Sequence, residues 1–162
     1  MTDLDKFLLT IGKIAVNFNV LEMSVRRLLW SMININNLTI GEAVTKSLDS
    51  SGLEILGNRL IPTLGLTHEQ TTRFKSAFSK FSEVRNQRNS NLHQILRIPN
   101  EANGPISRAW PQHHKKGTFH SDGQPIMMSA VLKTNQDCLD LTDSFDRLLE
   151  ELHCSDTDGG VA

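Results

Sequence analysis

The stretch FSEVRNQRNSNLHQIL, residues 81–96, decides the predicted fold of this chain. It continues an apolar pattern with the three-or-four spacing of an amphipathic helix, so we predict a helix from about residue 69 to about residue 96. Its apolar face contains Phe74, Ala77, Phe78, Phe81, Val84, Leu92 and Ile95. At about 100° per residue, Arg88 points along the middle of this face, while Asn86, Asn89 and His93 share a neighbouring face.

The chain before this stretch predicts a long first helix. Apolar side chains recur at helical spacing from residue 4 to residue 33, and the Asn-rich run at 34–37 ends the pattern. Glu22 falls within the apolar face of this helix, as Arg88 does in the later one. Because a buried charge is costly unless it is paired, we expect Glu22 and Arg88 to form a salt bridge or to share a bridging water. The alternative is that Arg88 forms another structural ion pair or extends its head into water.

Capping boxes indicate where the next helices begin. The three matches are Thr39 to Glu42, Ser51 to Glu54 and Thr67 to Gln70. They predict a helix over residues 41–48, a helical region that Pro62 and Gly65 limit to a few turns, and the helix that contains Arg88.

Pro99 ends that helix, and a change in composition follows it. Residues 100–125 are rich in Gly, Pro, His and Lys, so we treat residues 99–127 as an insertion, either a loop or a short β-hairpin. Its candidate strands are residues 106–110 and 117–120.

A final helix follows the insertion and begins at Ser129. Its predicted apolar face contains Leu132, Cys138, Leu141, Phe145, Leu148, Leu149 and Leu152. Residues 154–162 are expected to be a disordered tail. The prediction is therefore an all-α fold, an antiparallel bundle of four to five helices that forms a single domain over residues 1–153.

Composition limits the classes of protein that fit. A chain of 162 residues with 38% hydrophobic content is enough for one core, and its net charge of −1 gives no global attraction to nucleic acid or membrane. The two cysteines have no metal-like spacing and are too few for a disulfide framework. We see no signal peptide and no run of about 18 apolar residues, so we expect a cytoplasmic protein without a membrane span.

The segment RNSNLH, from Arg88 to His93, resembles the Arg-Asn-x-x-x-His form of the Arg-x(4–6)-His motif of HEPN domains (higher eukaryotes and prokaryotes nucleotide-binding). The surroundings are also similar. The motif lies near the end of a long helix, and the earlier segment IGKIAVNFNVLEMSVRRLL resembles the first helix of these domains, with its glycine and its central Glu22. The likeness in layout covers about residues 4–152.

This resemblance implies an all-α bundle that dimerises and, in active members of the family, a metal-independent endoribonuclease. Two copies of the motif would meet across the dimer interface to form one composite site. Arg88 and His93 correspond to the catalytic pair, and Asn89 to the polar residue that often follows the arginine. Glu22, Arg85 and Asn86 are the supporting candidates.

The residue types suit RNA cleavage without a metal or a cofactor. Imidazole has an unperturbed pKa near 6.5 and can act as acid or base, and the guanidinium fork matches phosphate oxygens. The expected partners are RNA, a second copy of the chain and an antitoxin or defence-system protein. Some toxins of the family contain a modifiable tyrosine two residues after the histidine. Here that residue is Ile95, and the chain has no Tyr, which excludes silencing by tyrosine modification.

Other polar clusters allow weaker hypotheses. His113, His114, His120 and Asp122 could bind a metal, but a solvated loop or an RNA-facing basic patch with Lys115 and Lys116 is the stronger interpretation. Arg97 would extend that basic surface. Two functions from other classes also remain open. One is a catalytically inactive HEPN-type module that binds a nucleotide or a partner, and the other is a helical adaptor in which the motif only stabilises the core.

Overall fold

Helices make up most of the molecule. The computed structural model describes residues 3–33, 37–92, 95–97, 107–109, 124–125 and 127–157. Its helices are α1 (Asp3–Met32), α2 (Leu38–Thr45), α3 (Ser50–Leu60), α4 (His68–Leu92) and α5 (Met128–Thr157), and a 3-10 turn, η1 (Ile61–Thr63), follows α3. The strands are β1 (Ile95–Arg97), β2 (Ser107–Ala109) and β3 (Gln124–Pro125). The predicted all-α class is confirmed.

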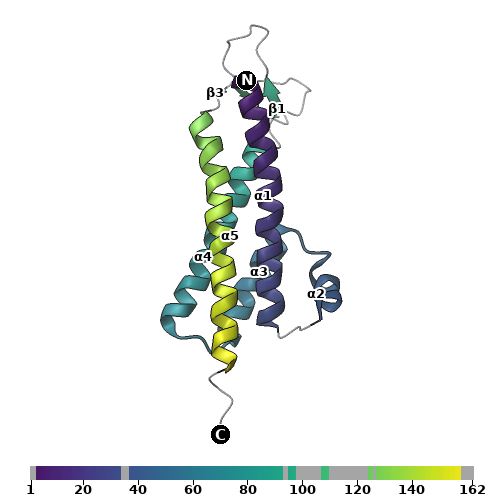
Figure 1. Ribbon diagram of the computed structural model, residues 1–162, viewed down its shortest axis with the longest axis vertical. Coiled ribbons are helices and arrows are strands. Elements are labelled where there is room, and N and C mark those ends of the chain that lie inside the picture. The colour runs from purple at the N-terminus through teal and green to yellow at the C-terminus, as the bar shows by residue number, and fades with distance from the viewer. Residues whose placement is uncertain are drawn as a thin grey trace, which may run out of the picture.

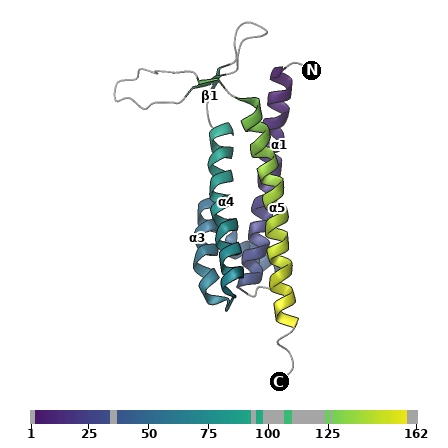
Figure 2. The same cartoon turned by 90° about the vertical axis from the view of Figure 1, so that its left-hand side faces the viewer.

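Three long helices, α1, α4 and α5, lie side by side along the longest axis of the molecule (Figures 1 and 2). Both α1 and α5 begin at the end marked N in Figure 1, so these two helices are parallel. Helix α4 runs the other way, since Asn91 contacts Thr134 near the start of α5 and Arg73 contacts Glu151 near its end. The arrangement therefore differs from a purely antiparallel bundle.

Helix α3 explains this difference. After α1, the chain passes through α2 and returns to the middle of α1, where the Ser50 hydroxyl donates a hydrogen bond to Glu22. Helix α3 then runs in the same direction as α1. It packs antiparallel on α4, with Glu54 beside Arg85 and Gly57 against the ring of Phe78. The α3–α4 pair is thus the antiparallel hairpin of this fold.

The start points of α2 and α3 lie earlier than the capping boxes predicted. The Asn37 side chain caps α2 by accepting from the amides of Thr39 and Ile40, and Asp49 caps α3 by accepting from Gly52. Asn and Asp are strong N-cap residues, and here they act two residues before the Thr and Ser of the predicted boxes. The third box is confirmed. Thr67 and Gln70 exchange hydrogen bonds of 2.9 and 3.2 Å at the start of α4.

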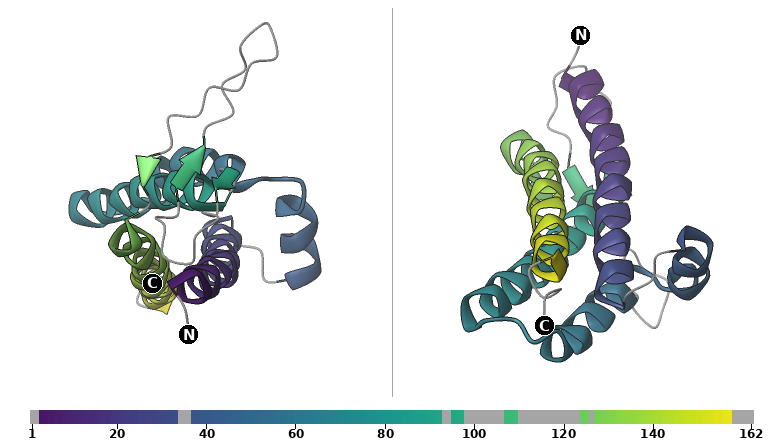
Figure 3. Two further views of the ribbon diagram at one scale, coloured as in Figure 1. Left: turned by 90° about the horizontal axis from the view of Figure 1, so that it is seen from above. Right: turned by 60° about the horizontal axis from the view of Figure 1, so that its bottom comes forward.

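Helix α2 stands off the side of the long helices and is held by a few contacts (Figures 1 and 3). Gly41 lies against the Trp30 indole, where an added Cβ would come within 2.7 Å of the ring. The Trp30 indole N–H donates to the Thr45 hydroxyl at 3.1 Å. Arg26 donates to the carbonyls of Thr45 and Leu48, which satisfies acceptors at the end of α2.

Helix α1 is apolar on two opposite faces. One face packs in the core, while Leu9, Val16, Val20 and Met23 on the other face are each about half exposed. As a result residues 4–32 are long and apolar enough to cross a membrane, contrary to the expectation of no such segment. The sequence contains no long unbroken apolar run, but its polar residues are spread thinly enough for the whole helix to qualify. A core helix of a soluble protein meets the same criterion.

The interior contains two apolar clusters with a polar layer between them. The larger cluster includes Phe18, Phe81 and Phe145, and the smaller one joins Phe7, Ile14 and Val131 near the N-terminal end of α1. Between them lies what we call the polar layer, which consists of Asn17, Arg88, Asn91, Thr134 and Asn135. Within it Asn17 donates to Asn135 at 2.9 Å and Asn91 to Thr134 at 3.1 Å. The motif arginine therefore lies at a defined level of the bundle.

Helix α4 ends at Leu92, four residues before the predicted end. Strand β1 follows it, and Ile95 pairs with Ala109 of β2 in antiparallel register. β-branched Ile95 and Ile98 before Pro99 favour extended backbone over helix, and the pairing with β2 supplies the hydrogen bonds. Strand β3 pairs antiparallel with β2. Of the two predicted strands, β2 lies within residues 106–110, and residues 117–120 lie outside the described part of the chain, as does most of the 99–127 insertion.

Helix α5 differs from its prediction in two respects. Leu132 is 51% exposed and Val131 is buried instead, because at about 100° per residue Leu132 lies about 120° from Cys138 around the helix, whereas Val131 lies on the same face as Cys138. The helix also continues to Thr157, so residues 154–157 are helical, although we predicted a disordered tail from residue 154. Residues 158–162 lie outside the described chain. The buried positions Cys138, Leu141 and Phe145 agree with the prediction.

Candidate functional site

Arg88 lies on the inner side of α4, as its helical phase predicted. Its guanidinium carbon is 5.2 Å from the centroid of the Phe18 ring of α1, within the range of a cation–π interaction. One guanidinium nitrogen, Nη1, donates to the Asn89 amide oxygen at 3.0 Å. The arginine is only partly exposed. The Arg-Asn pair of the motif therefore acts as one unit at the edge of the core.

The other predicted residues of this face are described in part. Asn86 and Asn89 are exposed on α4, in agreement with their predicted position beside the apolar face. His93 follows directly after the last residue of α4 but lies outside the described residues. Its placement on the face beside Arg88 therefore stays a prediction.

Glu22 does not pair with Arg88. Its carboxylate accepts a hydrogen bond from the Ser50 hydroxyl of α3, and among the ion pairs that join described residues none links it to Arg88. The predicted direct salt bridge is therefore wrong, and the alternative of a shared bridging water stays a prediction. Helical phase placed both charges toward the interior correctly, but Ser50 stands closer to Glu22, and the ring of Phe18 lies under the arginine.

Arg85, one turn before Arg88, is the arginine that forms an interhelical ion pair. It donates to Glu54 of α3 at 2.9 Å and to the Ser82 hydroxyl at 3.0 Å. The side chains of Arg85 and Glu54 are only 17% and 22% exposed. The contacts of Arg85 thus join α3 to α4.

Asn91 and Thr134 form a part of the site that sequence reasoning missed. Asn91 is 6% exposed and Thr134 is 3% exposed, so their hydrogen bond is shielded from water. Asn91 lies within the motif, between Arg88 and His93 in sequence. The signal was present in the sequence, because Asn91 falls on the same side of the helix as Val84. Burial of a polar side chain there fixes the end of α4 against α5.

Cys138 of α5 is a buried thiol close to Arg88. Burial and, to a smaller extent, the negative charge of Asp137 raise the pKa of this thiol to about 11, against the opposing influence of the positive charge of Arg88. Burial has the largest influence, so the thiol is neutral at physiological pH. It behaves as a small core side chain beside the arginine.

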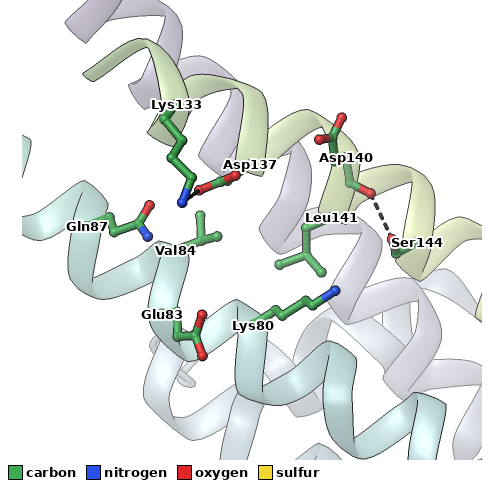
Figure 4. Close-up of a pocket in the computed structure, with 9 residues that line it drawn as sticks. All are labelled: Lys80, Glu83, Val84, Gln87, Lys133, Asp137, Asp140, Leu141 and Ser144. Atoms are coloured by element: carbon green, nitrogen blue, oxygen red, sulfur yellow. Dashed lines mark hydrogen bonds and ion pairs between the residues drawn. The ribbon is translucent and has the colours of Figure 1, made fainter. Parts of the chain in front are cut away.

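The described surface contains hollows along the contact of α4 with α5. Figure 4 shows one of 290 Å³, which is lined by Gln87, Lys80 and Glu83 of α4 and by Lys133 and Asp137 of α5. Acidic and basic groups alternate there, and Lys133 pairs with Asp137 at 3.9 Å. Arg88 and Asn89 line none of the three described hollows. Within the motif, Ser90 and Asn91 do line one of these hollows, together with Ala130, Lys133 and Thr134 of α5.

Comparisons with known proteins give no family for this chain. No family model, curated protein or solved structure matches it. The resemblance of Arg88–His93 to the HEPN motif therefore stands on its own residues.

The predicted basic patch and metal candidates lie mostly outside the described residues. This applies to Lys115, Lys116 and the histidine-rich loop at residues 113–122. Arg97 lies in β1, paired with Ser107. In the part of the chain that is described, no three His, Cys, Asp or Glu side chains come together as a metal site would require.

The described geometry provides a fixed cation. Its guanidinium is held by an aromatic ring below and an amide beside it, at the end of a helix whose next residues complete the motif. A guanidinium held in this way is suited to binding phosphate oxygens with little loss of conformational entropy.

Proposed function

We propose that this chain is a metal-independent endoribonuclease of the HEPN type. The observation that carries the proposal is the placement of Arg88, a partly buried guanidinium that lies over Phe18 and donates to Asn89. A cation that only solubilised the surface would extend into water. Instead this arginine is held at one level of the bundle, directly before the sequence that ends in His93.

The chemistry follows from the residue types. The 2′-oxygen attacks the adjacent phosphorus, the bond from phosphorus to the 5′-oxygen breaks, and a 2′,3′-cyclic phosphate and a 5′-hydroxyl result. Arg88 binds the phosphate oxygens and stabilises their charge in the transition state. His93 removes the proton from the 2′-hydroxyl or supplies one to the leaving 5′-oxygen. Asn89 orients the guanidinium that it contacts.

Two copies of the chain would form the complete site. In a two-fold dimer, two histidines are available, so acid and base come from different protomers. The proposed setting is the cytoplasm, with a toxin or anti-phage defence role and a protein antitoxin as regulator. RNA is the substrate, and the basic residues Lys115, Lys116 and Arg97 extend its binding surface.

The deciding experiment is RNA cleavage in the presence of a chelator. Purified wild-type chain is compared with Arg88→Ala and His93→Ala, with loss of cleavage expected in both variants. Arg59→Ala and His68→Ala are matched controls, because both residues are exposed on α3 and α4 away from the motif. Cleavage that persists in His93→Ala, or that the chelator abolishes, would reject the proposal.

A catalytically inactive binding module is the second candidate. It is favoured by the contacts of Arg88, which hold a cation for anion binding and involve no proton transfer. In that case the wild-type chain binds RNA or a nucleotide without cutting RNA, and His93→Ala binds equally well. Arg88→Ala loses the binding.

A further inference from the structure

Phe18 contacts Arg88 through its ring, and it belongs to a buried, closely packed aromatic part of the core. Its ring is 2% exposed and stacks on Phe81, with centroids 5.9 Å apart and an angle of 6° between the planes. Phe81 in turn packs edge-on against Phe145 at 6.1 Å. Three helices therefore hold the ring on which the guanidinium rests.

A buried, closely packed ring has a direct consequence for the arginine. An arginine side chain has many rotamers, and ordering it on binding a ligand costs free energy. A cation–π contact is stronger where water is excluded, and the face of Phe18 also fixes where the guanidinium lies. Asn89 holds one nitrogen of the same group. These two contacts restrict the position of the guanidinium without any bound ligand.

We propose that Phe18 is a positioning residue of the candidate site, whose ring pre-orders the Arg88 guanidinium for a nucleic-acid phosphate. This inference rests on the proposed function, in that Arg88 binds RNA. Phe18 does not touch the substrate and acts only through the arginine. Any aliphatic side chain of similar size would fill the core but would not fix the guanidinium.

The test measures RNA binding without cleavage. The probe is a short fluorescent single-stranded RNA with 2′-O-methyl groups, which lacks the attacking hydroxyl. Phe18→Leu is compared with Phe145→Leu, an equally buried phenylalanine of the same cluster with the same change in size. Both substitutions are made in the wild-type chain and in the Arg88→Ala chain.

Phe18→Leu is expected to weaken binding about tenfold, as removal of a water-shielded cation–π contact does. Phe145→Leu is expected to change binding less than about twofold at matched folded fraction. In the Arg88→Ala chain, Phe18→Leu has no further effect, because a ring that acts through the arginine has nothing left to position.

Three outcomes overturn the inference, and each can be told from the others. If Arg88→Ala weakens binding but Phe18→Leu does not, only the positioning role fails. If Arg88→Ala binds as tightly as wild type, the proposed function fails with it. An equal loss on Phe18→Leu in both backgrounds would show a purely structural role and would also overturn it.

A second variant and an NMR measurement keep the test decisive if Phe18→Leu fails to fold. Phe18→Met keeps most of the volume with a flexible side chain and removes the ring. The NMR chemical shift of the Arg88 side-chain N–H is sensitive to the Phe18 ring, over which the guanidinium lies. The signal is expected to shift in Phe18→Met and to stay in place in Phe145→Leu, and an unmoved signal in Phe18→Met would contradict the contact.

Discussion

Two arginines one turn apart on α4, Arg85 and Arg88, have opposite surroundings. Arg85 is enclosed by an acid and a hydroxyl, Glu54 and Ser82, and its contacts connect two helices. Arg88 lies on an aromatic ring and contacts the amide of its neighbour. The difference arises because helix α3 packs against the part of α4 that contains Arg85 and does not extend along α4 as far as Arg88. Arg85 has a counter-ion from α3 and joins two helices, while the role proposed for Arg88 is to bind an RNA phosphate.

The largest expected effect is a difference between the two arginines, since substitution of Arg88 lowers activity and substitution of Arg85 lowers stability. Arg88→Ala is expected to reduce RNA cleavage about 10²- to 10³-fold, as loss of one transition-state donor does, with little change in stability. Arg85→Ala is expected to lower the free energy of unfolding by about 2 kcal/mol, because Glu54 is left half-buried without its partner. Cleavage rates and urea unfolding of both variants check this. Equal losses of activity at equal folded fraction would remove the distinction.

A substitution at Gly57 tests whether the close packing of α3 on α4 encloses Arg85. An added Cβ at Gly57 would lie 2.1 Å from the Phe78 ring, so Gly57→Ala is expected to force α3 away from α4 and to cost about 3 kcal/mol. Gly12→Ala is the matched control. It meets nothing within 4 Å in the middle of α1 and is expected to stabilise the chain by about 0.5 to 1 kcal/mol. Thermal unfolding compares the two, and a Gly57→Ala chain as stable as wild type would refute the close packing.

The pKa of the buried Cys138 thiol depends in part on the charge of Arg88. Its pKa in the folded chain is raised to about 11 from an ordinary 9.0, so the unfolded thiol loses its proton first as pH rises. The stability that this thiol contributes is complete below about pH 9 and is lost between pH 9 and 11. By linkage the loss is at most about 3 kcal/mol.

The measurement is urea unfolding from pH 8 to pH 11 in a Cys154→Ser background. Cys138→Ala is expected to lose less stability over this range, since other titrating groups are common to both chains. Arg88→Ala should raise the pKa of Cys138 further, whereas Arg85→Ala should leave it unchanged. An identical pH dependence with and without Cys138 would contradict the assignment.

Helical phase predicted the direction of the polar side chains of α1 and α4 well and their partners poorly, and on α5 it failed for Leu132, which is exposed. It placed Arg88 and Glu22 inward and Asn86 and Asn89 outward, and the structure agrees. It could not give the axial position of one helix relative to another, and that position decides which residues of the two helices are in contact. Glu22 therefore meets Ser50, and Glu54, which the sequence offered only as part of a capping box, meets Arg85.

Helix ends show the same limit in a local form. Thr67 and Gln70 form the predicted capping box, but Asn37 and Asp49 cap their helices ahead of the other two boxes. Several side chains near a helix start can accept the same amides, and the stronger acceptor at the right backbone geometry prevails. The end of α4 depended on strand pairing with β2, which is non-local and therefore absent from the local pattern.

The smallest expected effect tests the corrected partners directly. A double-mutant cycle of Arg85→Ala and Glu54→Ala is expected to give a coupling free energy of about 1 kcal/mol, since their pair is largely shielded from water. The corresponding cycle of Arg88→Ala and Glu22→Ala is expected to give a value near zero, because Glu22 bonds to Ser50 instead. Urea unfolding of the six variants and wild type supplies both values. Strong coupling in the second cycle would show that Glu22 interacts with Arg88. Arg88 would then have a structural role, as Arg85 does.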